Sequence, residues 1–425
     1  MQIKTPNLVA LSTFLLPIFV QRVFVGNSGD VYEINQNLPI QWLGFLSNFL
    51  FIFFFIVNSR HFKASNLLNW IFYALVFINF VHVMILLFVK NEQSWLPILA
   101  NVRQTIWFFV CLIASGTFTK TELINGLVIM TEFTIIVIFT SRLFYEITSI
   151  PFQMMISDGN PRSQGFLSEP STFACLLAGY LGVVIAKRNK IKIVIALLAA
   201  VATNSAIAYA GILVALSTSV MQLKVINARF RLLIGISMWF CFWLLLAVLL
   251  RFSYQISRIS VDLMNYFEAT GFSSTVVYSG FLARWLEAMS QLGVGIDHAL
   301  GGNTSIGGGS YRFLATVKMV SEMSADGSLW FGDGLGVQAQ IKFLRGESAL
   351  EFGFLPFLIS AFGIIFGLLI HFVVLVRVLL KNGLLYKFAL PCFVVSSFNS
   401  GGGFHMYSIA IIAAVHQYSS NLEDE

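Results

Sequence analysis

Charged residues are scarce in this chain. Asp, Glu, Lys and Arg make up 11% of the 425 residues, against about 25% in an ordinary soluble domain, and hydrophobic residues make up 57%. So apolar a composition excludes a water-soluble globular protein. It also excludes disorder, which requires low hydrophobicity and high net charge. The sequence therefore predicts a protein whose solvent is the lipid bilayer.

Cysteines are few and basic tracts are short. No C-x-x-C pair joins the cysteines, which all lie in apolar runs, at positions 111, 175, 241 and 392. This pattern predicts neither a disulfide framework nor a zinc site. The formal net charge is +6, but Lys and Arg are scattered between apolar runs, with the densest group at 187–192. Such spacing indicates membrane topology and does not favour a nucleic-acid partner.

Long apolar runs are abundant, and a bilayer crossing needs about 20 such residues. Runs of this kind lie near 8–25, 42–57, 67–89, 96–115, 123–141, 169–186, 232–250, 352–376, 388–398 and 404–418. The run 193–222 is flanked by basic segments on both sides, so we expect two crossings there, with a turn near Thr203 to Ser205. The fold class is therefore an all-α polytopic membrane protein, a single domain over 1–425 with about twelve transmembrane helices.

The distribution of basic residues fixes the expected orientation. With a cytoplasmic N-terminus, the inside segments 1–7, 58–66, 116–122, 187–192, 223–231 and 377–387 contain fourteen Lys and Arg, and the short outside loops contain one, Lys90. Both termini are then cytoplasmic, and the two longer connections, 142–168 and 251–351, are periplasmic. Within the membrane, Glu132 and Arg103 are expected to pair with each other, because an uncompensated charge there is costly.

The shorter outer loop, 142–168, runs into a predicted helix start. Proline is favoured at the first helical position, and Pro170 follows Ser168 and Glu169. A helix N-terminus favours an anionic ligand, and Arg162 lies just upstream. Glu169 is either a cap of this helix or a catalytic group.

The larger loop, 251–351, combines helical and glycine-rich segments. Residues 275–292 place apolar side chains at helical spacing and predict an amphipathic helix on the membrane face. Arg312 follows, and then glycines at every second position over 332–336, which let the backbone turn tightly and approach another segment closely. Glu351, Phe352 and Gly353 then lead into the next apolar run.

The string from Arg162 to Ala174 reads R-S-Q-G-F-L-S-E-P-S-T-F-A. It resembles the R-x-x-G-x-F/L-x-E-P-S-x-F-A signature of the Wzy-type polymerases, which assemble O-antigen and capsular repeat units and are relatives of the O-antigen ligases. Arg312, the glycines of 332–336 and the Glu-Phe-Gly step at 351–353 match the second half of that pattern. The number of spans and the late outer loop agree as well, so the resemblance covers most of the chain.

The resemblance implies a GT-C-type membrane glycosyltransferase at the periplasmic face of a bacterial inner membrane. Its donor and acceptor would be undecaprenyl-diphosphate-linked glycans, and a chain-length regulator protein would be a further partner. Ligases usually carry a histidine shortly before the last Glu-x-Gly step, where this chain has Lys342 and its neighbours, so the polymerase is favoured over a ligase acting on lipid A core. A lipid-linked oligosaccharide flippase or other transporter is the alternative from another class. It should place charged or broken segments at mid-membrane in paired halves, whereas here the polar residues of interest gather on one outer face.

The residues fit such chemistry. Transfer from a lipid diphosphate needs cations for the leaving group and a base for the acceptor hydroxyl, and guanidinium groups bind phosphate oxygens bidentately without a metal. The candidate diphosphate ligands are Arg162, Arg312, Arg284 and Arg345. The candidate bases are Glu169, Glu347 and, third, His298. Neither outer loop shows a D-x-D pair or a cluster with ligand spacing, so we expect metal-independent, inverting transfer without a cofactor.

Overall fold

The structure is a computed structural model that describes about half of the chain. The described segments are 5–20, 106–107, 110–157, 160–167, 170–203, 205–222, 226–227, 229–237, 252–274, 323–325, 327–332, 354–398 and 403–416, with single residues between them. Their elements are α1 (Thr5–Phe19), α5 (Lys120–Thr148), β1 (Met154–Ser157), β2 (Asn160–Ser163), α6 (Pro170–Ala186), α7 (Lys190–Ala202), α8 (Ala206–Met221), α10 (Ser253–Ala269), the short 3-10 helix η2 (Phe272–Ser274), α16 (Phe354–Leu380), α17 (Leu384–Phe398) and α18 (Gly403–Val415).

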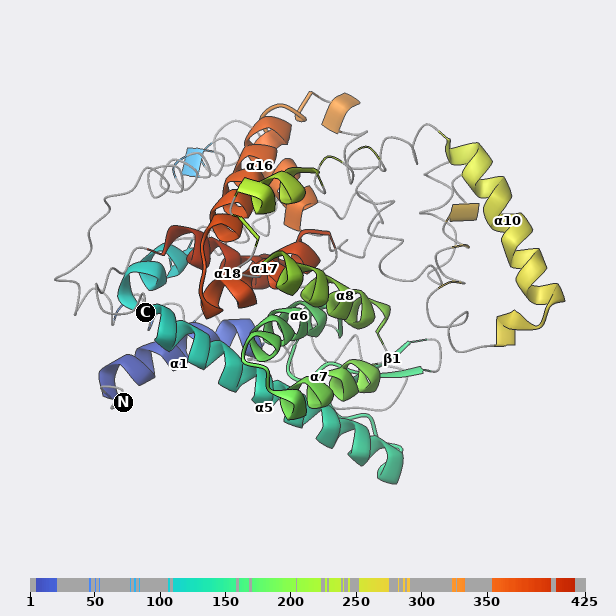
Figure 1. Cartoon of the computed structure of the whole chain (residues 1–425), viewed down its shortest axis with the longest axis horizontal. Helices are drawn as coiled ribbons and strands as arrows, with labels where there is room; N and C mark the ends of the chain where they lie inside the picture. Colours follow the sequence, from blue (N-terminus) through green and yellow to red (C-terminus); the bar gives the residue numbers. More distant parts are fainter. Residues whose placement is uncertain are drawn as a thin grey trace.

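The described part of the chain is mostly helical, with α6 at its centre. Helix α6 packs between α8 and α17, and α17 also packs against α18 (Figure 1). Glycines allow these helices to approach closely: a Cβ atom on Gly182 would lie 2.2 Å from the carbonyl oxygen of Lys387, and one on Gly211 would lie 3.1 Å from that of Ala174. Small residues at helix contacts are characteristic of helix association in membranes.

Helix α5 is long and begins at a defined cap. The Thr119 side chain accepts a hydrogen bond from the backbone N–H of Glu122, and the Glu122 carboxylate accepts one from the backbone N–H of Thr119. This reciprocal pair satisfies two N–H groups that would otherwise have no helical partner. The helix has 29 residues and so extends about 43 Å. It continues beyond the expected span 123–141 into the predicted outer loop and ends at Ser149.

The run 193–222 forms two helices, α7 and α8, as predicted. The break falls at Thr203, where the backbone N–H donates to Ala199, and α8 begins after Ser205. Helix α7 starts at an Asn189 cap, whose side chain accepts from the backbone N–H of Lys192. The basic segment 187–192 therefore lies at one end of both α6 and α7.

Helix α16 is not straight, although the sequence analysis treated 352–376 as one span. The backbone at Gly363 has φ 78° and ψ 169°, which is outside the helical region. Residues on the two sides of this break pack together, because a Cβ atom on Gly367 would lie 2.8 Å from the backbone nitrogen of Ile359. The chain therefore turns sharply at Gly363 and forms two helical pieces.

Helix α10 stands apart from the central helices, at the far side of the molecule in Figure 1. It is amphipathic, yet several of its large apolar side chains are exposed, among them Ile259, Leu263 and Tyr266. This helix was not predicted from the sequence. The amphipathic helix predicted for 275–292 lies largely outside the described residues.

Within the described residues, two helices are long and apolar enough to cross a membrane, α5 and the segment Leu355–Leu380 of α16. The fold class is thus supported as helical, with the small sheet β1–β2 as an unpredicted addition. Among the described residues, Cys111, Cys175 and Cys392 are buried and form no disulfide. The fourth cysteine, at position 241, lies outside the residues that the structure describes.

Candidate functional site

The predicted motif is built on a β-hairpin between α5 and α6. Strands β1 and β2 pair antiparallel, with Arg162 opposite Met155 and Ser163 opposite Met154. Arg162 is partly buried. The sequence had predicted a loop over 142–168, and the structure corrects this prediction with a hairpin. Its sequence signal is Asp158-Gly159 between the two strands, a dipeptide that favours a two-residue hairpin turn.

Gly165 explains the glycine of the motif. Its backbone has φ +64°, and a Cβ atom there would lie 2.9 Å from Cγ2 of Thr134 and 3.8 Å from Cγ1 of Ile138. Both residues belong to α5, so the turn after β2 rests directly on that helix. The neighbouring Phe166 ring stacks on Phe133 of α5, with 6.3 Å between the centroids. The turn that follows Arg162 is therefore held against α5.

One face of α5 is buried and partly polar where it faces this turn. Thr131, Thr134, Ile138 and Ser141 recur at helical spacing and are all at most 3% exposed. The two threonine hydroxyls donate back to carbonyl oxygens of their own helix. Polar residues that recur at helical spacing on so apolar a helix could have indicated from the sequence that this face of α5 packs against another segment.

Several buried polar atoms around the motif have no hydrogen-bond partner among the residues that the structure describes. They are Oγ of Ser141, Oγ of Ser163 and both amide atoms of Gln164. All three side chains are 0% exposed. Buried polar groups in proteins are almost always hydrogen-bonded, and leaving one unsatisfied costs about 1–3 kcal/mol. Ser163 and Gln164 directly follow Arg162 in the chain, so their buried polar atoms are available to hydrogen-bond a polar ligand at this position.

The other predicted site residues lie outside the described part of the chain. Arg162 is placed, and the remaining predicted ligands and bases, Arg312, Arg284, Arg345, Glu169, Glu347 and His298, are not described. The structure does place the start of α6 at Pro170, as the motif predicted. Arg162 on β2 is therefore separated by only seven residues of chain from the N-terminus of α6.

The glycine stretch of the large loop makes a close backbone contact at its first residue. Gly332 has φ +73°, and a Cβ atom there would lie 2.5 Å from the backbone of Ala361 and Gly363. A Cβ atom on Gly363 would lie 2.1 Å from the carbonyl oxygen of Trp330. The N–H of Ile364 donates to the carbonyl oxygen of Leu329 at 2.8 Å. Segment 327–332 therefore sits in the break of α16 and supplies a backbone acceptor there.

Glu132 is paired, but the described partner differs from the predicted one. Its Oε1 accepts hydrogen bonds from Lys192 Nζ at 2.6 Å and from the Tyr180 hydroxyl at 2.9 Å. These contacts join α5, α6 and α7. Arg103, the partner proposed from the sequence, lies outside the described residues. The pairing with Arg103 therefore stays a prediction, while the contact with Lys192 was not predicted because linear spacing does not show that the start of α7 reaches the middle of α5.

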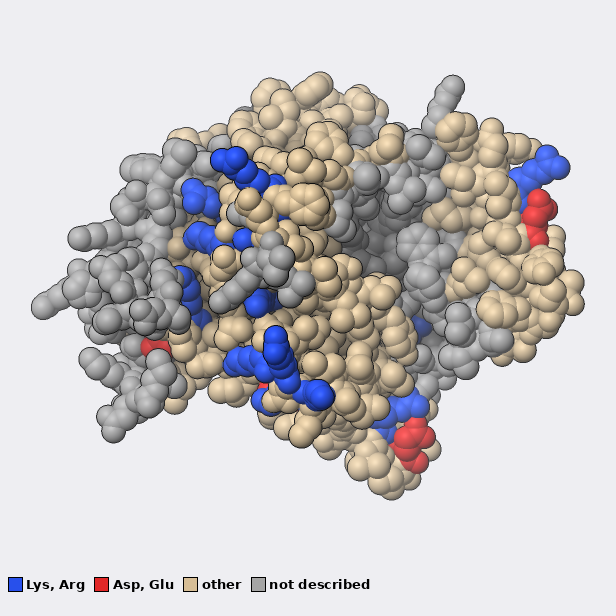
Figure 2. Space-filling view, viewed as in Figure 1, with Lys and Arg blue, Asp and Glu red and all other residues tan. Residues whose placement is uncertain are grey.

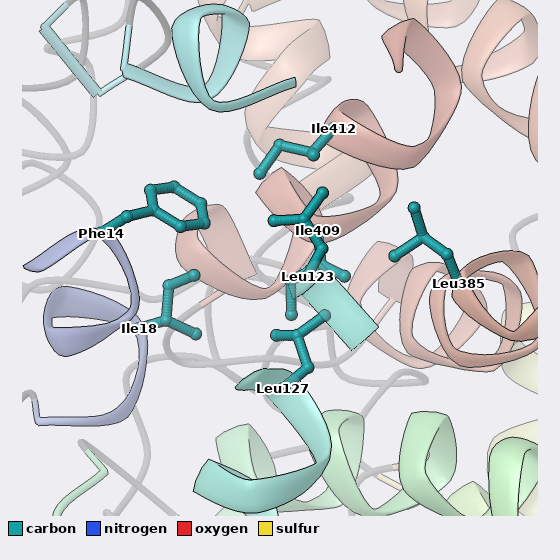
Figure 3. Close-up of a pocket in the computed structure, with 7 residues that line it drawn as sticks. All are labelled: Phe14, Ile18, Leu123, Leu127, Leu385, Ile409 and Ile412. Atoms are coloured by element: carbon teal, nitrogen blue, oxygen red, sulfur yellow. The ribbon is translucent and has the colours of Figure 1, made fainter. Parts of the chain in front are cut away.

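The apolar cavity at the contact of α1, α5, α17 and α18 is too small for a substrate. It measures about 10 Å³, which is room for about one water molecule. Figure 3 shows its lining: Phe14, Ile18, Leu123, Leu127, Leu385, Ile409 and Ile412. This cavity is a packing defect and offers no polar group for catalysis.

Among the described residues, no group of three or more His, Cys, Asp or Glu side chains could hold a metal ion. Comparison with family models, with curated proteins and with solved structures finds no match for this chain.

Proposed function

We propose that the chain is a membrane-embedded glycosyltransferase of the GT-C type. It joins undecaprenyl-diphosphate-linked repeat units into a surface polysaccharide at the periplasmic face of a bacterial inner membrane. The observation that carries the proposal is the construction of the motif: Arg162 lies on a hairpin whose next turn is fixed on α5 by Gly165. That turn leads within a few residues to the start of α6 at Pro170.

Exposed apolar side chains support a lipid environment. On α5, Ile129, Ile136, Leu143 and Ile147 are each more than 60% exposed, and most of the described surface visible in Figure 2 carries no charged side chain. Soluble monomers rarely expose contiguous apolar patches of more than a few hundred Å². A bilayer removes this cost for α5, and the helix is long enough to cross it.

The packing also agrees with the proposed sidedness. Segments at one end of the helices are joined in two pairs by hydrogen bonds. His416 contacts the carbonyl oxygen of Phe118, and Arg231 donates to Asn382. The sequence places 116–122, 223–231 and 377–387 on the cytoplasmic side. Segments that share a side of the membrane must be able to meet, and these do. The motif hairpin belongs to the opposite, periplasmic connection.

The proposed reaction is a single displacement. The acceptor hydroxyl oxygen forms a bond to the anomeric carbon while the bond from that carbon to the diphosphate oxygen breaks, and the electron pair leaves with the diphosphate. Arg162 binds the diphosphate and stabilises its growing charge, since guanidinium groups bind phosphate oxygens in pairs. The dipole of α6 acts in the same direction. The Glu169 carboxylate takes the proton of the hydroxyl.

The remaining expected residues complete the proposal. Arg312, Arg284 and Arg345 supply further cations for the diphosphate, and Glu347 is the second candidate base. The polar groups of Ser163 and Gln164 are placed beside Arg162 along the chain, and they hydrogen-bond the sugar or diphosphate. No step in this scheme uses a metal ion.

A transporter of lipid-linked oligosaccharides is the second candidate, and the broken helix α16 favours it. Helices interrupted within the membrane frequently surround transported substrates, and the non-helical backbone at Gly363 is such an interruption. A ligase acting on lipid A core is a third reading that shares the site of the polymerase.

The test uses the purified full chain in nanodiscs with a lipid-linked repeat unit. Arg162→Ala should reduce glycan lengthening by about 100-fold or more, as loss of a preorganised charge-stabilising group does, and Arg162→Lys should also be impaired because an ammonium makes no bidentate contact. The control is Arg142→Ala, another arginine of the same predicted outer region, which should polymerise normally. Wild-type rates in Arg162→Ala would refute the diphosphate site. Movement of the lipid-linked repeat across the bilayer without lengthening would establish the transporter instead.

A further inference from the structure

A group of cations lies at the end of the bundle opposite the motif. Lys120 begins α5, Arg377 lies in the last turn of α16, and Lys381 lies between α16 and α17. We call these three residues the end cluster. Figure 2 shows Lys and Arg side chains gathered over the part of this face where α16, α18, α6 and α7 lie, with few acidic side chains among them.

Contacts between the ends of three helices hold Lys381 of the end cluster in place. Lys381 Nζ donates to the carbonyl oxygen of His416, at 3.4 Å, and lies 5.6 Å from the centre of the Tyr386 ring. The His416 ring nitrogen Nε2 lies 2.9 Å from the carbonyl oxygen of Phe118, just before α5. The ends of α16 and α18 and the start of α5 are thereby tied around Lys381.

Two further hydrogen bonds hold the turn between α16 and α17. Arg231 donates to Oδ1 of Asn382 at 2.7 Å, and the Gln222 amide donates to the carbonyl oxygen of Tyr386 at 3.3 Å. Arg231 is itself buried. The turn that carries Lys381 is therefore fixed from α8 and from the segment after it, so the positions of the cations do not depend on flexible side chains alone.

Acidic residues are scarce in the segments that carry the end cluster. The only Asp or Glu in 116–122, 223–231 and 377–387 is Glu122, and its carboxylate is engaged in the α5 cap with Thr119. Burial, together with the smaller effects of the nearby charges of Arg377 and Lys120, lowers the pKa of Lys381 from 10.5 to about 8. A bound anion would relieve this repulsion.

We propose that the end cluster is a binding site for the phosphate of an anionic phospholipid headgroup. Lys120, Arg377 and Lys381 surround the phosphate, and the acyl chains lie along the apolar exposed surface of the neighbouring helices. The exposed Ile365, Phe366 and Leu369 of α16 belong to that surface. Basic pockets between helices at the cytoplasmic side are suited to lipid phosphate groups, and the end cluster lies on the predicted cytoplasmic side.

The experiment measures lipid binding by the delipidated full chain in a neutral detergent, with native mass spectrometry and thermal unfolding as readouts. Dioleoylphosphatidylglycerol should bind and raise the unfolding temperature, and dioleoylphosphatidylcholine should not. In Arg377→Gln/Lys381→Gln the apparent affinity for phosphatidylglycerol should fall roughly tenfold or more. The matched control is Lys187→Gln/Lys190→Gln, which removes two exposed cations of another predicted cytoplasmic segment and should keep the wild-type affinity.

Two further arms separate the possible sources of the anion. Inorganic phosphate alone should not raise the unfolding temperature; if it matches the lipid, the site binds a free anion and the lipid assignment is wrong. The sequence ends in Glu423, Asp424 and Glu425, so the measurements are repeated with these three changed to Gln, Asn and Gln. The proposal is overturned if phosphatidylglycerol affects neither chain, or if the control pair loses as much affinity as the end cluster pair.

Discussion

The Glu132 carboxylate on α5 holds the ammonium group of Lys192 on α7 at 2.6 Å, and Tyr180 of α6 donates to the same oxygen. One acidic side chain in the middle of the apolar helix α5 thus ties three helices together. The Lys192 and Glu132 side chains are 41% and 32% exposed, so the pair is partly buried and each charge compensates the other.

We expect Lys192→Met to destabilise the protein, because it leaves the Glu132 carboxylate without its cation. On insertion scales an uncompensated charge within a membrane costs about 2.5–3.5 kcal/mol, and the double variant Glu132→Gln/Lys192→Met should recover much of this loss. Thermal unfolding in detergent and in nanodiscs measures the effect. The control is Arg142→Gln, which breaks an exposed i, i+4 pair with Glu146 and should change stability by less than about 0.5 kcal/mol. Equal effects of the two single variants would contradict the account.

Gly363→Ala should be among the most damaging single substitutions in α16. The new methyl group would meet the Trp330 carbonyl group at 2.1 Å, and the backbone φ of +78° disfavours any side chain. The expected loss is about 3 kcal/mol or more, since a steric clash adds to backbone strain.

Gly271→Ala is the matched control for this effect. Gly271 also has a positive φ, of +73°, but nothing lies within 4 Å of its Cβ position. Its substitution should cost only the backbone strain, about 1–2 kcal/mol. Comparing the two unfolding temperatures isolates the contact between segment 327–332 and α16, and a similar cost for both would refute that contact.

Gly165→Ala should displace the motif turn from α5 and reduce activity more than stability. The added methyl group would lie 2.9 Å from Cγ2 of Thr134. Because that carbon is absent from serine, Gly165→Ala/Thr134→Ser should relieve the clash and regain part of the glycan lengthening, while the strain of the positive φ persists. Lengthening rates and unfolding temperatures are measured for the wild type and the three variants. Failure of Thr134→Ser to improve the Gly165→Ala protein would show that the turn does not depend on this contact.

Stability should fall as the pH drops below about 6.5, because of His416. Burial lowers the pKa of this imidazole from 6.5 to about 4; Lys120 and Lys381 also lower it, and the hydrogen bond with Phe118 partly opposes them. Between these pH values the unfolded chain takes up a proton that the folded chain does not. Unfolding is then favoured by up to about 1.4 kcal/mol per pH unit.

The variant His416→Gln tests the assignment of this pH dependence. Its amide can still donate to the Phe118 carbonyl oxygen, but it does not titrate. The unfolding temperature of the wild type should decrease between pH 6.5 and pH 4.5 relative to that of the variant, and above pH 7 the two curves should run parallel. Identical curves over the whole range would show that another group is responsible.

Helix starts and breaks were predicted best where the residues that determine them are close together in the sequence. Pro170 marked the start of α6, and basic residues on both sides of 193–222 predicted the pair α7 and α8. The Thr119 and Glu122 cap was likewise readable as a start of α5, although the sequence analysis did not use it. Each of these signals lies within a few residues of the feature it predicts.

Contacts between segments that are distant in the sequence could not be predicted from the sequence. Hydropathy alone cannot show that α16 breaks at Gly363, because a break changes the backbone and leaves the composition apolar. Nor does spacing reveal that Lys192 reaches Glu132, since that contact depends on how α7 crosses α5. At the candidate site the motif located Arg162 and Gly165, but the buried stripe of α5 that receives the turn became visible only in three dimensions.

The break in α16 bears on how the protein is made. Under the proposed function, the apolar stretch Leu355–Leu380 would enter the bilayer as it is synthesised, and its final form needs the carbonyl oxygen of Leu329 to accept from the N–H of Ile364. That acceptor belongs to segment 327–332, which lies within the predicted outer loop 251–351. For such a membrane protein, we expect segment 327–332 to dock into the break of α16 only after translocation, so a chain cut or lengthened between 332 and 354 should insert normally but reach its final fold slowly.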